Sequence, residues 1–346
     1  MKLIIFAGGV GTRLWPLSRV NSPKQFDCIF GGRSTLQLAF ARIAPVFGAS
    51  NVFVQTIYPY REIIKKQLPE LPAENILLEP ARRDLGPAVC FAVNELWRRG
   101  ERGAMAILWS DHLMEKTDEF TGALQAAERL IERDPDRFVL LAEKPRFANN
   151  NLGWIKLGEE ISREKNFATH YFAGWKYRPP HEECLEMYDS GNYFWNPGYF
   201  VTSIEFLRES YARLAPEIYD SVCAGDYQSA PKLHFDQAII ERLDLSRAVV
   251  IKLEMGWSDP GTLYALKEAL EKSREDNVAA GHVIAYQTSD SLLYNLEPGK
   301  ILAAVGLNGM VVVNTNDALL VAPKSEIVHI TKLLKKMEEK NLQEYL

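Results

Sequence analysis

A short apolar strand followed by a glycine-rich loop most constrains what this sequence can fold into. Residues 3–6 (Leu-Ile-Ile-Phe) are continuously apolar, as in strands that are buried on both faces of an α/β sheet. The loop that follows contains Gly8, Gly9 and Gly11, and glycine lets the backbone approach a ligand closely. Consecutive N–H groups in such a loop can form a nest for phosphate oxygens. These residues therefore predict an α/β fold with a phosphate-binding loop at the end of a strand.

The residues after the glycines narrow the kind of phosphate loop. Thr12 and Arg13 follow directly, and Lys24 lies in the string S-P-K-Q-F; arginine offers a planar fork that suits phosphate. A P-loop would end in Lys and then Ser or Thr, whereas here Arg13 follows Thr12. The dinucleotide fingerprint G-x-G-x-x-G would need one more glycine after Gly11, and the sequence lacks it. A surface turn with an exposed arginine remains the plain alternative.

Apolar strands and amphipathic helices alternate along the chain. Strands are expected at residues 51–55, 76–78, 104–108 and 138–142, and helices at residues 36–43, 60–67, 88–97, 119–133, 203–214, 236–243 and 262–275. This alternation predicts a mostly parallel, doubly wound, Rossmann-like sheet with helices on both faces. Ligands of such sheets bind at the carboxyl ends of the strands, where the glycine-rich loop is expected.

Charge and composition make several other functions unexpected. The 346 residues carry a net charge of −5 without a block of like charge, so we expect neither nucleic acid nor a membrane surface as a partner. The first apolar run is too short for a signal peptide or a transmembrane helix. The widely spaced cysteines form no zinc-ligand pattern and predict buried thiols in a reducing cytoplasm; they are Cys28, Cys90, Cys184 and Cys223.

The long string G-G-V-G-T-R-L-W-P-L-S-R, followed by S-P-K-Q-F, resembles the signature of the sugar nucleotidyltransferases, and within them most closely the mannose-1-phosphate guanylyltransferases. The resemblance implies an enzyme that joins GTP and a hexose 1-phosphate to give a GDP-sugar and pyrophosphate. Mannose 1-phosphate is the hexose 1-phosphate that the resemblance favours. The resemblance also implies that the glycines and Thr12 cradle the phosphates, that Arg13 holds the leaving pyrophosphate, and that Lys24 lies beside the α-phosphate. A sugar phosphate is already an anion at neutral pH, so no general base is needed.

The string E-P-A-R-R-D-L-G-P-A resembles the segment that borders the purine in this family. Arg83 and Pro87 match the family, whereas Asp84, Leu85 and Gly86 replace Asn, Thr and Ala. The carboxylate of Asp84 suits the N–H donors of guanine better than the acceptor at N1 of adenine, which predicts GTP over ATP. A helix cap at Asp84 or Gly86 explains the same residues and is compatible with binding.

Other matches fall where the family contacts the sugar phosphate. Gly153 begins G-W-I in place of G-Y-I, and Asn196 ends Y-F-W-N before a proline. Tyr177 and Arg178 stand where the family has Glu and Lys, so the carboxylate is lost while the positive charge is kept as a fork. An ordinary strand end and an Asn-Pro turn are the plain alternatives. Another sugar or nucleotide, or a non-catalytic regulatory paralogue, therefore stays open, although retention of the charged residues argues against a regulator.

Two aspartates match the metal ligands of the family. Asp111 follows A-I-L-W-S, and Asp259 lies in W-S-D-P-G-T-L; both are expected to follow strands at the same edge of the sheet. Mg²⁺ is usually held by one or two carboxylates together with substrate phosphates, so this pair predicts a magnesium site. A helix cap is the alternative for Asp111, and His112 beside it is expected to be structural.

Residues 277–346 differ in texture from residues 1–276, which we expect to form the catalytic domain. Four apolar residues recur at the six-residue spacing of a left-handed β-helix, namely Ile301, Leu307, Val313 and Leu319. Plain strands would also give this spacing, but the resembled family carries a short β-helix here. An amphipathic last helix follows, and its apolar stripe is expected to pack on the large domain or on a second subunit. A homodimer through the C-terminal segment is thus open.

Overall fold

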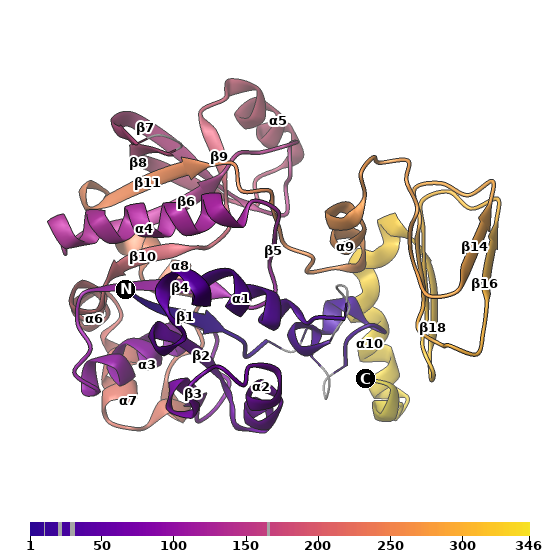
Figure 1. The fold of residues 1–346 in the computed structure, drawn as a ribbon, viewed down its shortest axis with the longest axis horizontal. Coiled ribbons are helices and arrows are strands. Elements are labelled where there is room, and N and C mark those ends of the chain that lie inside the picture. Colours follow the sequence, from indigo (N-terminus) through magenta and orange to yellow (C-terminus); the bar gives the residue numbers. More distant parts are fainter. Residues whose placement is uncertain (10, 20–22, 28–31, 165–166) are drawn as a thin grey trace. The chain divides into compact units, whose positions relative to one another are not determined.

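The computed structural model describes residues 1–346 except residues 10, 20–22, 28–31 and 165–166, so Cys28 lies outside the described residues. The chain divides into two compact units. Unit 1 consists of residues 1–8, 39–110 and 114–257, and unit 2 of residues 9–38, 111–113 and 258–346. The chain crosses between the units in the glycine-rich loop, within α1 (Thr35–Phe47), on both sides of residues 111–113, and in β12 (Trp257–Ser258) (Figure 1).

Unit 1 is built on a ten-stranded mixed sheet with the order β11-β8-β7-β9-β6-β10-β4-β1-β2-β3. Parallel pairs join β1 (Lys2–Phe6), β2 (Val52–Ile57), β3 (Ile76–Glu79) and β4 (Ala104–Trp109), and likewise β6 (Phe138–Glu143) and β11 (Ala248–Leu253). Antiparallel pairs add β7 (Gly153–Glu164), β8 (Phe167–Tyr177), β9 (Tyr193–Asn196) and β10 (Phe200–Ser203). The predicted α/β sheet is confirmed.

Helices cover both faces of this sheet. One face shares a core with α3 (Leu85–Arg98), α6 (Ile204–Leu214), α7 (Pro216–Cys223) and α8 (Phe235–Ala238). On the other face α4 (Thr117–Arg133) packs across β4, β6, β10 and β11 (Figure 1). Two shorter helices, α2 (Arg61–Gln67) and α5 (His181–Ser190), lie in the connections. Among the described residues, no helix has both the length and the apolar character needed to cross a membrane.

Four helices differ by three residues or more from the prediction. Helix α1 runs to Phe47, four residues past its expected end. Helix α3 starts at Leu85 rather than at residue 88, because Asp84 caps it. The helix expected at residues 236–243 is the single turn α8 followed by a 3-10 turn, since Ile239 (φ −124°) leaves the helical region. The helix expected at residues 262–275 is α9 (Leu263–Leu270), which ends where Glu271 becomes extended.

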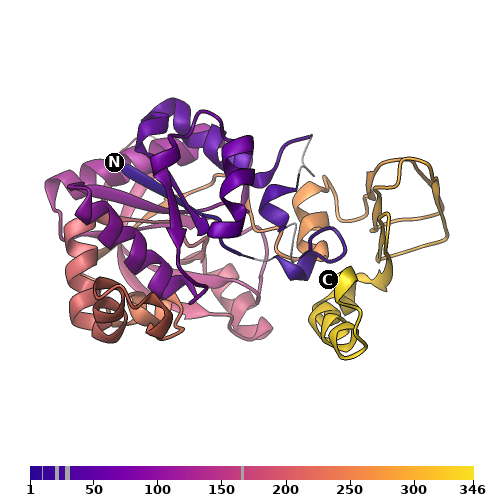
Figure 2. The same ribbon diagram turned by 90° about the horizontal axis from the view of Figure 1, so that it is seen from below.

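The C-terminal part of unit 2 forms a β-helix-like segment, as predicted. In one sheet the strands β13 (Val278–Ala280), β15 (Leu292–Asn295) and β17 (Met310–Asn314) are parallel and β18 (Leu319–Pro323) closes the edge, while β14 (Val283–Tyr286) pairs with β16 (Leu302–Val305). Figure 2 views these coils nearly along their stacking axis, so that successive coils overlie one another.

The last helix, α10 (Ile330–Glu339), packs within unit 2. It buries Ile330 and Leu334 in a core that also contains Leu14, Trp15 and Leu263. The unit therefore covers Ile330 and Leu334 of the apolar stripe, whereas Leu333 is 40% exposed.

The apolar repeat expected inside the β-helix was wrong in register. Ile301 is 69% exposed and Leu319 is 62% exposed, and only Val313 of the four is fully buried. Equivalent residues are 19 apart where β15 pairs with β17 and β14 with β16, as the side-chain bonds Asn314–Asn295 and Asn308–Ser289 also show. This coil is one residue longer than three hexapeptides, and a slip of one residue turns a strand's side chains to the opposite face. Leu293, Ala304 and Val312 fill the interior instead.

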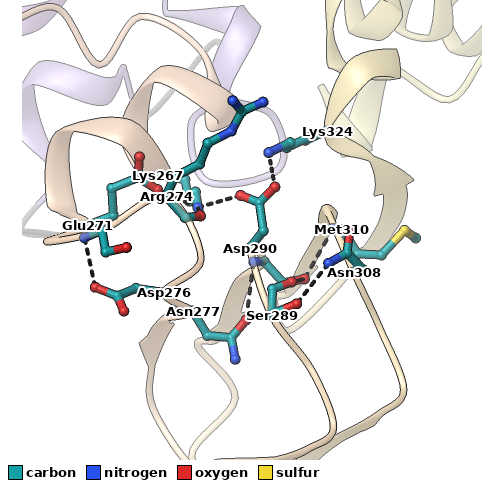
Figure 3. A network of polar contacts seen from close by, with 12 residues as sticks. Lys267, Glu271, Arg274, Asp276, Asn277, Ser289, Asp290, Asn308, Met310 and Lys324 are labelled. Atoms are coloured by element: carbon teal, nitrogen blue, oxygen red, sulfur yellow. Dashed lines mark hydrogen bonds and ion pairs between the residues drawn. The ribbon is translucent and has the colours of Figure 1, made fainter. Parts of the chain in front are cut away.

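A buried ionic cluster joins α9 to the β-helix-like segment. Lys267, whose side chain is 3% exposed, donates hydrogen bonds to Asp290 Oδ1 (2.5 Å), to the Arg274 carbonyl (2.7 Å) and to Glu271. Asp290 Oδ2 also accepts from Lys324, so the carboxylate lies between two ammonium groups (Figure 3). Because each charge faces a partner, the cluster leaves no charge of Lys267 or Asp290 unpaired.

Candidate functional site

Lys24 lies at the centre of the candidate site, which is formed entirely within unit 2. Its side chain is 10% exposed, and its Nζ lies 2.6 Å from Asp111 Oδ2 and 3.9 Å from Asp259 Oδ1. Both carboxylates therefore face the same ammonium group. The structure therefore brings together the predicted lysine and both predicted metal ligands.

Burial and charge oppose each other in this cluster. Burial lowers the pKa of Lys24, but the carboxylates of Asp111 and Asp259 outweigh burial and the nearby positive charge of Arg13, and raise that pKa above its ordinary value. Burial likewise raises the pKa of Asp111, whereas Lys24 and His112 bring it down to about 2. Lys24 and Asp111 are therefore a charged pair at neutral pH.

Asp259 supplies a polar atom that the protein leaves unsatisfied. Its Oδ1 is buried and makes no hydrogen bond among the described residues, and a buried acceptor without a partner costs about 1–3 kcal/mol. A divalent cation would satisfy this oxygen together with Asp111. In the part of the chain that the structure describes, no group of three or more His, Cys, Asp or Glu residues could hold a metal, so such a cation would need substrate oxygens as further ligands.

The glycine-rich loop packs directly against Lys24. Gly11 has φ +66°, and a Cβ at this position would lie 2.8 Å from Lys24 Cγ, so only glycine allows this approach. The hydroxyl of Ser18 donates to the Gly11 carbonyl, and Gln25 Nε2 donates to the Gly9 carbonyl at 2.8 Å. Both carbonyls are therefore bonded to protein donors.

Ser18 and Gln25 were not singled out from the sequence, although both lie inside the signature strings. Ser18 is 1% exposed and Gln25 is 2% exposed, although polar residues are mostly exposed. The sequence does not show this burial, which is why neither residue could be identified from it. Thr12 begins a 3-10 turn, Thr12–Leu14, and the side chain of Arg13 is exposed.

The two aspartates reach the cluster from different kinds of strand. Asp111 follows the end of β4 by two residues, as expected. Asp259 follows β12, which lies outside the ten-stranded sheet, so the expectation that both residues follow strands at one sheet edge was wrong. The buried carboxylate of Glu143 accepts N–H bonds from Met255, Gly256 and Trp257, immediately before β12 and at its start; sequence reasoning missed this anchor.

The predicted nucleotide-binding residues of unit 1 gather at the start of α3. Asp84 (φ +74°) accepts the Leu85 N–H at its Oδ1, which also lies 3.2 Å from His234 Nδ1. The helix-cap alternative therefore holds for this oxygen. Gly86 is needed because a Cβ would lie 2.5 Å from the carbonyl of Leu233, and Pro87 is buried in the first turn.

Two further polar groups of unit 1, on Arg83 and Glu79, are buried. Arg83 Nε is buried without a hydrogen-bond partner among the described residues. Glu79, at the end of β3, accepts a 2.9 Å hydrogen bond from Tyr227, and burial raises the pKa of its carboxyl group. A Cβ at Gly8 would lie 3.7 Å from Glu79 Oε1. Sequence reasoning named Arg83 and Gly8 but missed Glu79, because its burial depends on Tyr227, far along the chain.

The predicted sugar-phosphate residues lie side by side in unit 1. Gly153 on β7 pairs in register with Tyr177 on β8 and with Asn196 on β9, so these three residues form one row across the sheet. The guanidinium carbon of Arg178 lies 5.2 Å from the centre of the Tyr177 ring. The structure thus gathers four residues that are up to 43 positions apart in the sequence, from Gly153 to Asn196.

The α/β sheet with a glycine-rich loop after its first strand and the C-terminal β-helix-like segment agree with two family models. A family model described as nucleotidyl transferase matches residues 2–276, and the chain belongs to this family. A second model, described as the MannoseP isomerase/GMP-like beta-helix domain, matches residues 281–337.

The relatives point to one branch of this family. The chain is 31% identical to the mannose-1-phosphate guanylyltransferases of Salmonella montevideo and Escherichia coli K12, over 364 and 362 residues; each match covers 99% of this chain and 75% or 74% of the relative. A crystal structure described as mannose-1-phosphate geranyltransferase from Thermus thermophilus superposes with a TM-score of 0.86 at 26% identity, covering 97% of this chain and 99% of that one.

Proposed function

We propose that this chain transfers the guanylyl group of GTP to mannose 1-phosphate, giving GDP-mannose and pyrophosphate. The observation that carries the proposal is the buried Lys24 between Asp111 and Asp259, packed against the glycine-rich loop. A lysine and two carboxylates beside a loop of N–H donors suit a polyphosphate with its cation. The names of the relatives supply the base and the sugar.

The reaction is an in-line displacement at the α-phosphorus. A phosphate oxygen of the sugar phosphate forms the new P–O bond, the bond to the β-phosphate oxygen breaks, and the electron pair leaves with pyrophosphate. The nucleophile needs no base, since it is already an anion. The work of the protein is to position both anions and to neutralise their charge.

Each residue of the site has a part in that positioning. The N–H groups of Gly8, Gly9, Gly11 and Thr12 bind the phosphates, Arg13 holds the leaving pyrophosphate, and Lys24 neutralises charge at the α-phosphate. Asp111 and Asp259 would hold Mg²⁺, because Asp259 Oδ1 has no hydrogen-bond partner among the described residues. The cation, when bound, neutralises negative charge on the phosphates.

We propose that Arg83, Asp84, Gly86 and Pro87 border the purine, with GTP preferred over ATP. The cap occupies Asp84 Oδ1, which leaves Oδ2 to accept the N–H donors of guanine. Asp84→Asn keeps the helix cap but replaces the carboxylate, so we expect the ratio of kcat/KM for GTP over ATP to fall about tenfold. An unchanged ratio would assign Asp84 to the cap alone.

We propose that Gly153, Tyr177, Arg178 and Asn196 bind the sugar phosphate, with Arg178 on the phosphate group. Arginine binds phosphate with two parallel hydrogen bonds, and Arg178 Nε is already held by the Asn151 carbonyl at 3.2 Å. Arg178→Ala should raise the KM for mannose 1-phosphate by about tenfold or more and leave the KM for GTP nearly unchanged. If Arg178→Ala changes only the KM for GTP, this assignment is wrong.

The test of the function is pyrophosphate release over a panel of nucleoside triphosphates and sugar 1-phosphates. We expect the pair of GTP and mannose 1-phosphate to give the highest kcat/KM. Another preferred pair would support the alternative of a different sugar or base, which the residues at 177 and 178 suggest. Absence of release from every pair would support a non-catalytic regulatory paralogue.

We further propose that residues 1–276 carry the catalysis and residues 277–346 serve assembly. The two family models divide the chain near the same point. Strand β18 lies at a sheet edge and exposes Leu319 and Val321, which favours a homodimer through this segment. The three described cysteines are free thiols, which supports a cytoplasmic enzyme.

A further inference from the structure

The row of proposed sugar-phosphate residues in unit 1 is bordered by an aromatic pair, Trp175 and Tyr177. Trp175 and Tyr177 are two residues apart on β8, so their side chains leave the same face of the strand. Their ring centroids are 6.0 Å apart and the rings are inclined by 36°. Tyr177 is 61% exposed, so this ring presents a large apolar surface to solvent beside Gly153.

Gly153 keeps the middle of the row free of a side chain. A Cβ at this position would lie 3.4 Å from Asn196 Cβ and 3.6 Å from the Trp175 ring, so Trp175 lies against this glycine. The aromatic pair and the amide of Asn196 therefore flank one residue of bare backbone. An arrangement of one flat apolar surface and one amide suits a ring with an apolar face and hydroxyl groups, which is a pyranose.

The polar atoms around this row are already oriented. Asn196 Oδ1 accepts the Gly198 N–H at 2.9 Å, which leaves the NH₂ group of Asn196 as a donor. Arg178 has φ +48°, a conformation that is costly for a residue with a side chain, and its guanidinium lies over the Tyr177 ring. The ring thus helps to hold the cation that the proposed function assigns to the phosphate.

We infer that Trp175 and Tyr177 form a stacking platform for the pyranose ring of the sugar phosphate. The inference rests on the proposed function and deepens it, because it defines the substrate class. A carboxylate that binds a hydroxyl rejects analogues without that hydroxyl by large factors, since its acceptor is then left unpaired. A stacking surface contacts the apolar face of the ring, so an analogue that lacks one hydroxyl group loses little of this contact. The site therefore accepts hexose 1-phosphates that lack single hydroxyl groups.

The kinetic test uses GTP at saturation with mannose 1-phosphate and with its monodeoxy analogues at the ring hydroxyls. We expect the wild type to use each analogue with kcat/KM within about tenfold of the parent, and Tyr177→Glu to discriminate against at least one of them by about a hundredfold. Tyr177→Ala should raise the KM for mannose 1-phosphate about tenfold while the KM for GTP and Tm stay unchanged. The matched control is Tyr171→Ala, which removes an exposed tyrosine of the same strand.

Wild-type discrimination of about a hundredfold against one analogue, or an unchanged sugar-phosphate KM in Tyr177→Ala, would overturn the inference. Binding is measured separately by titrating mannose 1-phosphate into the full chain and following tryptophan fluorescence. A saturable fluorescence change in the wild type that disappears in Trp175→Phe supports the platform. It does so even if no pair of substrates releases pyrophosphate, a result that would defeat only the proposed function. A change that persists in Trp175→Phe counts against the platform.

Discussion

Two lysines of unit 2 each lie between two carboxylates, and the clusters differ in how completely their polar atoms are bonded. Lys267 donates to three acceptors, and both oxygens of Asp290 are bonded to ammonium groups (Figure 3). Lys24 has one close partner, Asp111, while Asp259 lies 3.9 Å away with a buried oxygen that makes no hydrogen bond among the described residues. A fully bonded cluster has no polar atom left for a ligand, whereas an incomplete one does.

The largest effect should come from Asp111→Asn, which keeps the shape but removes a charge beside the polyphosphate. We expect kcat, measured on the folded enzyme, to fall about a hundredfold or more, equivalent to roughly 3 kcal/mol. Tm should fall as well, because the buried ammonium group of Lys24 loses its closest carboxylate. Pyrophosphate release and thermal unfolding would be measured on the same preparation. Asp136→Asn, at a carboxylate whose side chain is 57% exposed, is the control. Near-normal turnover in Asp111→Asn would show that this residue has only a structural role.

A loss of stability without a loss of catalysis is expected for Lys267→Met in the bonded cluster. Removing one partner of a buried ion pair typically costs about 3–5 kcal/mol, so Tm should fall clearly while the KM values of the remaining folded enzyme stay the same. Lys65→Met, in a surface pair with Glu62 at 2.9 Å, is the control and should cost less than about 1 kcal/mol. Loss of activity at full stability in Lys267→Met would erase the contrast between the two clusters.

The pH dependence of stability should carry the signature of Asp290. Burial raises the pKa of Asp290, but Lys267 and Lys324 outweigh it and lower that pKa below its ordinary 3.8. A depressed pKa stabilises the folded state above about pH 4, and this contribution disappears as the pH falls through the folded pKa. The pKa of Lys267 is raised above 10.5, so its contribution disappears only as the pH rises through that raised pKa.

The matching variant is Asp290→Asn, since asparagine tolerates the left-handed backbone at this position (φ +51°). The difference in Tm between wild type and Asp290→Asn should be constant from about pH 5 to 8 and shrink below about pH 4. A difference that is the same at about pH 3 and pH 7 would contradict the assigned charge state.

The smallest effect is expected at Gln25, which holds the Gly9 carbonyl next to the incomplete cluster. Gln25→Met keeps the length of the side chain but removes the donor, so the carbonyl is free to turn toward the phosphates. We expect the KM for GTP to rise about fivefold, the size of one neutral hydrogen bond, with the KM for the sugar phosphate unchanged. An equal rise in both KM values would point to a general disturbance of the fold.

The incomplete cluster could be predicted from the sequence and the bonded one could not, for a physical reason. Asp111 and Asp259 stand in strings with a recognisable chemical requirement, and Lys24 stands in the signature itself. Lys267 and Asp290 lie in an ordinary helix and turn, and only the fold shows that they meet. The same limit explains the register error at Ile301 and Leu319, because the length of a coil is set by its turns and not by the spacing of apolar residues.

The sequence predicted the strands β1, β2, β3, β4 and β6 but not β7 to β11, and it placed the ends of several helices wrongly. Apolar runs mark buried strands directly, as for β1, β4 and β6, whereas helix ends depend on caps that face other elements. Gly86 in the first turn of α3 illustrates this. Glycine is required there because the carbonyl of Leu233, a residue far away in the sequence, lies against it.

The most direct test of the central claim is the release of pyrophosphate from GTP with mannose 1-phosphate in the presence of Mg²⁺, measured with each substrate omitted in turn. The account predicts release that requires both substrates, yields GDP-mannose in equal amount, and falls about a hundredfold in Asp111→Asn. Release from GTP alone, or release from both substrates that is unaffected in Asp111→Asn, would contradict the assignment of this site to guanylyl transfer.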